Sequence, residues 1–188
     1  MKKIILALFI LTSFSIFAQK PCEIDREFTD SLGSYKSLKQ QLIFERSFAG
    51  NSNRIYFTLS ISNGILSLET EMLQQSNEFI KANCLDQKSK IYLQLANGKI
   101  VTLLYNGIET CGTLIRSEDG KNNRITSATF LFSKENFEHL KTSKVTFMRI
   151  QYAGETVDYP FKTSFTSELD GKTYEPEKYF IENLKCFN

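Results

Sequence analysis

The chain has 188 residues, 41% hydrophobic and 23% charged, a composition that excludes disordered, collagenous and coiled-coil proteins and indicates one globular domain. Lys and Arg number 23 against 21 Asp and Glu, but Lys2 and Lys3 lie in a segment that the sequence predicts to be removed. Without them the counts are 21 and 21, so composition gives no electrostatic reason to bind nucleic acid or an anionic membrane.

Residues 1–18 have the pattern of a secretory signal peptide. Two lysines give a positive start, the apolar run of residues 4–17 follows, and Ala18 supplies a small residue at the cleavage position. The apolar run is shorter than the roughly 20 residues that span a bilayer. We therefore expect an exported protein, periplasmic or secreted, in which residues 19–188 form a single β-rich domain without a transmembrane segment.

Four cysteines follow the predicted cleavage point, and an even number in an exported chain predicts two disulfide bonds. Three pairings are open. Chain geometry favours Cys22 with Cys186, which joins the two ends, and Cys84 with Cys111, which flank one hairpin. No C-x-x-C pair exists, and His139 is the only histidine, so the sequence predicts neither a metal site nor a cofactor.

The first half of the body alternates apolar and polar residues, which is typical of strands with one buried face. In residues 54–62, Ile55, Phe57 and Leu59 share one face, and the Asn-Gly pair at 63–64 predicts a turn into the next strand. Residues 71–82 fit both a helix face and a continued strand. Both alternatives remain open from the sequence.

The strongest local pattern is a hairpin over residues 90–105. Its two apolar runs are joined by Asn97 and Gly98, the pair best suited to a two-residue type I′ turn. In that register Leu95 faces Ile100, and apolar side chains occur on both faces. We therefore expect a central hairpin that is covered to some degree on each side.

The second half predicts a strand over residues 125–132, a short helix over 134–142 capped by Ser133, and a further hairpin. His139 falls off the apolar stripe of that helix and is predicted to be exposed. In the hairpin, a two-residue loop at 153–154 predicts a structural ion pair between Arg149 and Asp158 on neighbouring strands.

The chain closes with a predicted helix over residues 176–185. Pro176 at its first position, early acids and a late lysine all favour a helix, and Phe180 and Leu184 would pack on the sheet. The fold class predicted is therefore mainly β, a β-rich α+β protein. It is an antiparallel sandwich or curved sheet with one short internal helix and a C-terminal helix.

A search for catalytic patterns finds no phosphate-binding loop, nucleophile elbow, zinc-protease motif or EF-hand. Residues 117–123 resemble a calcium loop only in composition and are interpreted as a hairpin tip. Paired carboxylates can serve a hydrolase, and the available ones are Glu109, Glu118, Asp119 and Asp158. The spacing of these residues favours no pair, so no catalytic residue is assigned. Glu109 and Asp158 are arbitrary candidates for the carboxylates of such a hydrolase.

Five segments, spread over nearly the whole predicted mature chain, carry a family resemblance: residues 22–30, 89–99, 130–140, 149–150 with 157–159, and 184–186. In these segments the chain resembles small exported proteins of unknown function from Bacteroidetes-type bacteria. The resemblance implies a periplasmic or surface location and carries no activity or ligand.

These observations lead to two functional hypotheses. The first is an uncharacterised exported protein acting as a non-catalytic binding or structural module of the periplasm or cell surface, with an unidentified protein or envelope component as its partner. The alternative is a small hydrolase that uses carboxylates. The lack of a catalytic motif favours the first hypothesis.

Overall fold

The computed structural model describes residues 21–187, so the predicted signal peptide at residues 1–18 lies outside the described residues. The fold is mainly β, as the alternating sequence predicts. Its strands are β1 (Ile24–Asp30), β2 (Gly33–Leu38), β3 (Gln41–Phe48), β4 (Asn51–Ser62), β5 (Ile65–Ser76), β6 (Lys90–Leu95), β7 (Ile100–Tyr105), β8 (Thr113–Arg116), β9 (Asn122–Phe132), β10 (Val145–Gln151), β11 (Thr156–Pro160), β12 (Phe165–Thr166) and β13 (Thr173–Tyr174).

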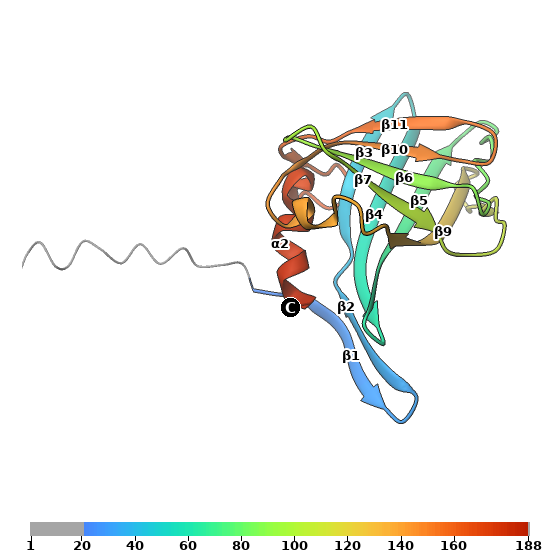
Figure 1. Ribbon diagram of the computed structural model, residues 1–188. Coiled ribbons are helices and arrows are strands. Elements are labelled where there is room, and N and C mark those ends of the chain that lie inside the picture. Colours follow the sequence, from blue (N-terminus) through green and yellow to red (C-terminus); the bar gives the residue numbers. More distant parts are fainter. Residues whose placement is uncertain (1–20, 188) are drawn as a thin grey trace, which may run out of the picture.

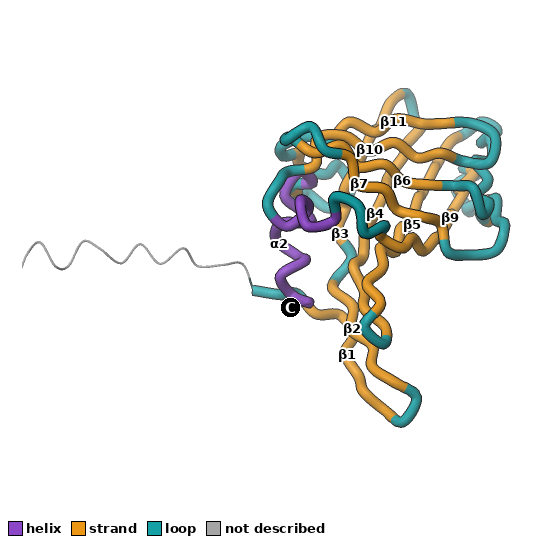
Figure 2. Tube along the Cα trace, in the orientation of Figure 1, coloured by secondary structure: helices purple, strands orange, loops and turns teal. Residues whose placement is uncertain are grey.

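The strands form one strongly curved antiparallel sheet, shown in Figures 1 and 2, in the order β1-β2-β4-β5-β9-β7-β6-β10-β11. Two further strands lie off this path: β3 pairs with β4, and β8 pairs with β9. The small hairpin β12–β13 forms a sheet of its own. The β1–β2 hairpin extends away from the body, and all of β1 is exposed.

The core lies on the concave face of this sheet. Phe44 of β3 contacts Tyr159 of β11 edge to face, with ring centroids 5.1 Å apart, so distant parts of the sheet approach each other around the core. Phe57 in the middle of β4 is fully buried and contacts Phe180 from the C-terminal segment. Burial of each such side chain stabilises the fold by about 1.5–3 kcal/mol.

The β6–β7 hairpin differs from the predicted register by one residue. Ile91 pairs with Leu103 rather than with Leu104, and Gln94 rather than Leu95 pairs with Ile100. The loop contains three residues: the Gly98 N–H donates to the Leu95 carbonyl and the Leu95 N–H to the Lys99 carbonyl. Gly98 has a φ of 80°, which a glycine adopts without strain.

This register has a simple cause, which is burial. It brings Ile91 and Leu93 opposite Leu103 and Val101, and all four side chains are fully buried. The predicted register would place Leu104, which is exposed, opposite Ile91. Because a one-residue slip moves a strand's side chains to the other face, the core selects the three-residue loop. The hairpin is central in the sheet order, as predicted. Its other face is only partly covered: Tyr92 and Thr102 are half-buried, whereas Ile100 and Leu104 are exposed.

The region that the sequence left open, residues 71–82, is a strand as far as Ser76, where β5 ends. The residues after it form no helix. At the other end of β5, Asn63 and Gly64 both have positive φ, 49° and 80°, and Ser62 pairs with Ile65. The predicted turn is therefore a two-residue loop of type I′.

The predicted helix over residues 134–142 is shorter than expected. It is a single 3₁₀ segment, η1 (Phe137–Lys141), preceded by Asn136 in a left-handed conformation. Ser133 lies too far upstream to cap it, and no side chain caps η1. His139 is half-buried rather than exposed, because a five-residue 3₁₀ turn packed by buried Leu140 brings its neighbours close to the sheet.

The C-terminal helix is present over part of its predicted range. The segment consists of η2 (Pro176–Lys178), α2 (Tyr179–Asn183) and η3 (Leu184–Phe187). Phe180 and Leu184 are buried, as their spacing predicts. Cys186 in η3 is bonded to Cys22 just before β1, with Cα atoms 5.8 Å apart, so the two ends of the described chain meet.

Candidate binding groove at the loop end of the sheet

A groove of about 470 Å³ lies where β3, β4 and β5 end. We call it the loop-end groove. It is lined by amide, hydroxyl and aromatic side chains together with one cation and one anion, namely Arg46, Phe48, Asn51, Ser52, Asn53, Gln74, Gln75, Ser76, Glu78, Phe79 and Ile80. The groove therefore carries mainly uncharged polar groups between two phenyl rings.

The floor of the groove continues the core face of the sheet. Successive side chains of a strand point to opposite faces, so Asn53 lies on the same face as buried Ile55, and Gln74 on the same face as buried Met72. Asn53 and Gln74 are paired across β4 and β5. Within residues 21–187 the side chains of Asn51 and Gln74 form no hydrogen bond, so both remain available to a ligand.

Two phenylalanines at the rim are unusually exposed. Phe48 is 78% exposed and Phe79 is 80% exposed. Phe48 ends β3 at a tight turn in which Ala49 has a φ of 48° and Gly50 a φ of 81°. A left-handed conformation costs an alanine about 1–2 kcal/mol, so the turn that presents Phe48 is maintained against local strain.

Phe79 lies on the segment that connects β5 to β6, residues 77–89, which we call the strap. Hydrogen bonds fix the strap on both sides of Phe79. The Glu78 N–H donates to Ser76 Oγ (2.9 Å), and Asn122 Nδ2 donates to the Glu78 carbonyl (3.0 Å). On the other side, the Ile80 carbonyl accepts from Arg124. The exposure of Phe79 is therefore not a consequence of a loose loop.

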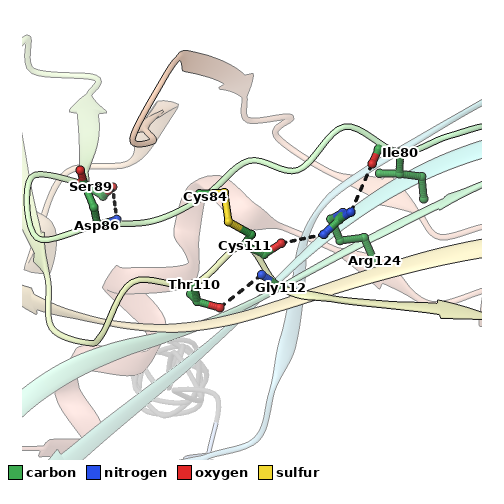
Figure 3. The surroundings of a disulfide bond; sticks show 8 residues. All are labelled: Ile80, Cys84, Asp86, Ser89, Thr110, Cys111, Gly112 and Arg124. Atoms are coloured by element: carbon green, nitrogen blue, oxygen red, sulfur yellow. Dashed lines mark hydrogen bonds between the residues drawn. A yellow bond between two sulfur atoms is a disulfide. The ribbon is translucent and has the colours of Figure 1, made fainter.

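Arg124 connects the strap to the β7–β8 connection (Figure 3). Its guanidinium donates from Nη1 to the Cys111 carbonyl (2.8 Å) and from Nη2 to the Ile80 carbonyl (3.4 Å). The side chain is only 8% exposed and pairs with no carboxylate in the part of the chain that the structure describes. Its Nε is buried and has no partner among the described residues. The two hydrogen bonds from this buried cation to main-chain carbonyls hold both segments at a fixed separation.

The Cys84–Cys111 disulfide joins the same two segments. Beside it, Leu85 and Thr110 exchange main-chain hydrogen bonds of 2.7 and 3.0 Å. The Ala153 N–H, from the β10–β11 turn, donates to the Cys84 carbonyl (2.8 Å). Both cysteine pairs are those that the sequence favours, and here the bond fixes the strap to two neighbouring loops.

A layer of buried hydroxyls lies below the groove. Tyr152 and Tyr159 are hydrogen bonded through their hydroxyls (3.2 Å), and Tyr152 Oη also lies 3.2 Å from the Met72 sulfur. Burial raises the pKa of both phenols, so both are uncharged at neutral pH. Asn53 hydrogen bonds to Tyr159, which connects this layer to the groove floor.

A second depression, of about 550 Å³, lies on the outward face of β6, β10 and β11. We call it the outer-face depression; its lining includes Tyr92, Phe147, Arg149 and Gln151. Here three of the polar side chains are hydrogen bonded to neighbours. Tyr92 Oη donates to Gln151 Oε1 (3.1 Å), and Arg149 forms two hydrogen bonds, 2.7 and 2.9 Å, with Asp158. The predicted cross-strand partners are opposite each other.

The ion pair shifts both partners in the expected directions. The hydrogen bonds from Arg149, together with its positive charge, hold the pKa of Asp158 below its ordinary value. The same contacts raise the pKa of Arg149. Both residues are exposed, so the pair is a surface contact and its net contribution is small.

The other carboxylates named from the sequence are not brought together as a site. Asp119 accepts a hydrogen bond from Ser117 at the tip of the β8–β9 hairpin, Glu118 lies at the same tip, and Glu109 is exposed in the β7–β8 connection. Within residues 21–187 none of them is hydrogen bonded to Asp158 or His139. Within residues 21–187 no group of three or more His, Cys, Asp or Glu side chains could hold a metal ion.

Comparison of the chain with protein-family models, curated proteins and solved structures gives no match. Among the helices of residues 21–187, none has the length and apolar character needed to cross a bilayer. The class of this protein is therefore defined by its own fold and surface: a disulfide-bonded, curved antiparallel sheet with a polar, aromatic-rimmed groove at its loop end.

The groove was not identified from the sequence, although part of its pattern is visible there. Two short polar runs, residues 51–53 and 74–77, lie at the ends of strands that otherwise alternate apolar and polar residues. Each run is close in sequence to a phenylalanine. Those runs mark places where a core face becomes polar. Their meeting in space depends on the β4–β5 pairing and on the path of the strap.

Proposed function

We propose that the protein is a non-catalytic binding module of the cell envelope, acting in the periplasm or at the cell surface through the loop-end groove. The observation that carries this proposal is the pair Phe48 and Phe79. Both rings are largely exposed, both line one groove, and the backbone that carries each is fixed by a tight turn or by flanking hydrogen bonds. A rigidly presented apolar pair stabilises a complex without a large ordering cost.

The two disulfides support the cellular setting. They indicate an oxidising, non-cytoplasmic environment, and an envelope location follows from the predicted signal peptide. The location in the periplasm or at the surface is part of the proposal.

The side chains of the groove favour binding over catalysis. They are amides, hydroxyls and phenyl rings, with one arginine and one glutamate. A carboxylate-dependent hydrolase needs two carboxylates near one substrate. In the candidate Asp158, both carboxylate oxygens already accept hydrogen bonds from Arg149. No contact among the described residues favours that alternative.

The test is capture of envelope material by the exported protein, produced from the 188-residue sequence. Wild type is compared with Phe48→Ser/Phe79→Ser and with the control Leu32→Ser, which removes an 89%-exposed apolar side chain from the β1–β2 turn. We expect the groove variant to lose capture and the control to retain it. Equal capture by all three proteins would exclude the groove as the binding surface.

A further inference from the structure

We infer that the ligand of the loop-end groove is an uncharged carbohydrate chain. This inference rests on the proposed function and specifies its ligand. It is argued from the charge of the groove, from the hydrogen-bonding capacity of its floor and from the rings at its rim.

The charge of the groove excludes a strongly ionic ligand. Arg46 and Glu78 are its only charged lining residues, and their charges cancel. The buried phenols beneath the floor are uncharged because burial raises the pKa of Tyr152 and Tyr159. A phosphorylated or uronic acid ligand would need several cationic groups to replace its hydration, and the groove provides one.

The floor matches the chemistry of sugar hydroxyls. Each hydroxyl of a sugar both donates and accepts a hydrogen bond, and a side-chain amide also does both. Four such amides line the groove, from Asn51, Asn53, Gln74 and Gln75. Asn53 hydrogen bonds to Tyr159 and Gln75 Nε2 donates to Asn123 Oδ1 (3.0 Å), which leaves two of the four for a ligand. Asn51 and Gln74 have no partner within residues 21–187, so a ligand satisfies them without breaking an existing contact.

The rim matches the other side of a sugar ring. A pyranose has an apolar face of C–H groups, and flat aromatic rings bind such faces through apolar contact. Phe48 and Phe79 provide two rings beside the amides. Ile80, whose carbonyl is held by Arg124, fixes the strap behind Phe79, so this ring is placed before a ligand arrives.

The outer-face depression also contains rings and one amide without a side-chain partner among the described residues, Gln94, but its rings are not exposed like those of the groove: Tyr92 and Phe147 are half-buried. There Tyr92 is hydrogen bonded to Gln151, and Arg149 to Asp158. A sugar bound there would have to compete with these contacts. The two surfaces therefore differ in the exposure of their rings and in the number of amides without a partner among the described residues, two in the groove and one in the depression.

The experiment measures binding of the exported protein to immobilised neutral oligosaccharides of glucose, mannose, galactose and N-acetylglucosamine. An oligomer of galacturonic acid is the charged comparator. We expect saturable binding to at least one neutral oligosaccharide, little effect of salt, and a loss of at least about tenfold in affinity for Phe48→Ser and for Phe79→Ser. Gln74→Leu is expected to lose binding, and Leu32→Ser to retain it. Phe48 and Phe79 are exposed and Gln74 is half-buried, so each variant should fold, which circular dichroism checks.

The outcomes separate this inference from the proposed function. Failure of every neutral oligosaccharide to bind overturns the carbohydrate inference, and so does tighter, salt-sensitive binding of the galacturonate oligomer. If envelope capture still depends on Phe48 and Phe79 in that case, the binding-module proposal stands, and loss of capture after protease treatment of the envelope identifies a polypeptide partner. If capture is also independent of both rings, both proposals fail.

Discussion

The loop-end groove and the outer-face depression have similar side chains but differ in how those side chains are used. In the outer-face depression, Arg149 holds Asp158 through two hydrogen bonds, and Tyr92 holds Gln151. In the groove, Asn51 and Gln74 have no such partner among the described residues, while two phenylalanines are 78% and 80% exposed. The two surfaces are therefore similar in composition and differ in the exposure of their rings and in the number of amides left without a partner, and the proposal that the groove binds a ligand rests on that difference.

Removal of the Cys84–Cys111 disulfide, behind the groove, is expected to have the largest effect on binding by the groove. The Cys84–Cys111 bond closes a loop with a sequence separation of 27, so Cys84→Ser/Cys111→Ser should lower the free energy of unfolding by about 3–4 kcal/mol. The strap should also lose its fixed position, and ligand affinity should fall. Urea denaturation and the capture assay measure the two effects.

The matched control is Cys22→Ser/Cys186→Ser. It opens a loop with a sequence separation of 164 and should cost more, about 5 kcal/mol. The folded fraction, measured at low temperature, should nevertheless bind like wild type because this bond lies at the termini. If the terminal disulfide proves necessary for capture and the strap disulfide does not, the assignment of the groove is wrong.

The second effect concerns Arg124, which supports the groove from below. Arg124→Met leaves the carbonyls of Ile80 and Cys111 without a partner and should cost about 2 kcal/mol, since relief of the buried charge offsets part of the loss. Hydrogen exchange of the strap amides should accelerate. Arg149→Met, in the outer-face depression, is the control and should leave strap exchange unchanged; faster exchange there would contradict local support by Arg124.

The third effect tests the hairpin that carries Phe48, through an ion pair on its opposite face. Arg54 Nε lies 2.6 Å from Glu45 Oε1, and the Glu168 N–H also donates to Glu45. Burial alone would raise the pKa of Glu45, but the hydrogen bonds from Arg54, Ser167 and Glu168 outweigh it and hold the pKa below its ordinary value of 4.5.

A lowered pKa in the folded state fixes the sign of the pH dependence. The contribution of Glu45 to stability is fully present above its unfolded pKa and is lost as pH falls through the lower, folded value. Wild type should therefore lose more stability than Glu45→Gln when thermal unfolding is compared at about pH 6 and about pH 3. An equal loss of stability in wild type and in Glu45→Gln would show that this ion pair does not contribute to the stability of the folded protein.

The smallest effect is expected in the outer-face depression. Asp158→Asn removes the charge that Arg149 binds, but both partners are exposed, so solvent screens most of the attraction. A double-mutant cycle with Arg149→Met should give a coupling close to experimental error, and capture should not change. A large coupling, or a loss of capture, would remove the distinction between the two surfaces.

The sequence predicts most of the fold, and its errors have physical causes. Alternation in residues 54–62 and the Asn63-Gly64 turn identify the β4–β5 hairpin correctly. The same Asn-Gly signal at residues 97–98 gives the wrong register, because burial of Ile91 and Leu93 selects a longer loop. The preference of Asn-Gly for a two-residue turn stabilises the hairpin less than burial of its apolar face does, so tertiary packing sets the register of the β6–β7 hairpin.

The groove is less predictable than the fold. The polar residues of its floor can be recognised in the sequence as two polar strand ends, but the position of Phe79 depends on the path of the strap. Nothing local in residues 77–89 indicates that Asn122 and Arg124 hold them. Such contacts between segments far apart in the sequence appear only when the sheet order is known. Candidate residues chosen by chemical type, such as His139 and Glu109, consequently miss the surface.

The nested arrangement of the two disulfides has a consequence for oxidation in the cell. Cys22 is bonded to the last cysteine of the chain, while Cys84 and Cys111 pair between them. If the chain is exported N-terminus first, as the predicted signal peptide implies, Cys22 and Cys84 are both exposed to oxidation before Cys186 and can form a bond that is absent from the folded protein. Correct pairing then depends on thiol–disulfide exchange. Refolding of the complete reduced chain favours the short Cys84–Cys111 loop instead, so an isomerase should assist export-coupled oxidation far more than refolding in solution.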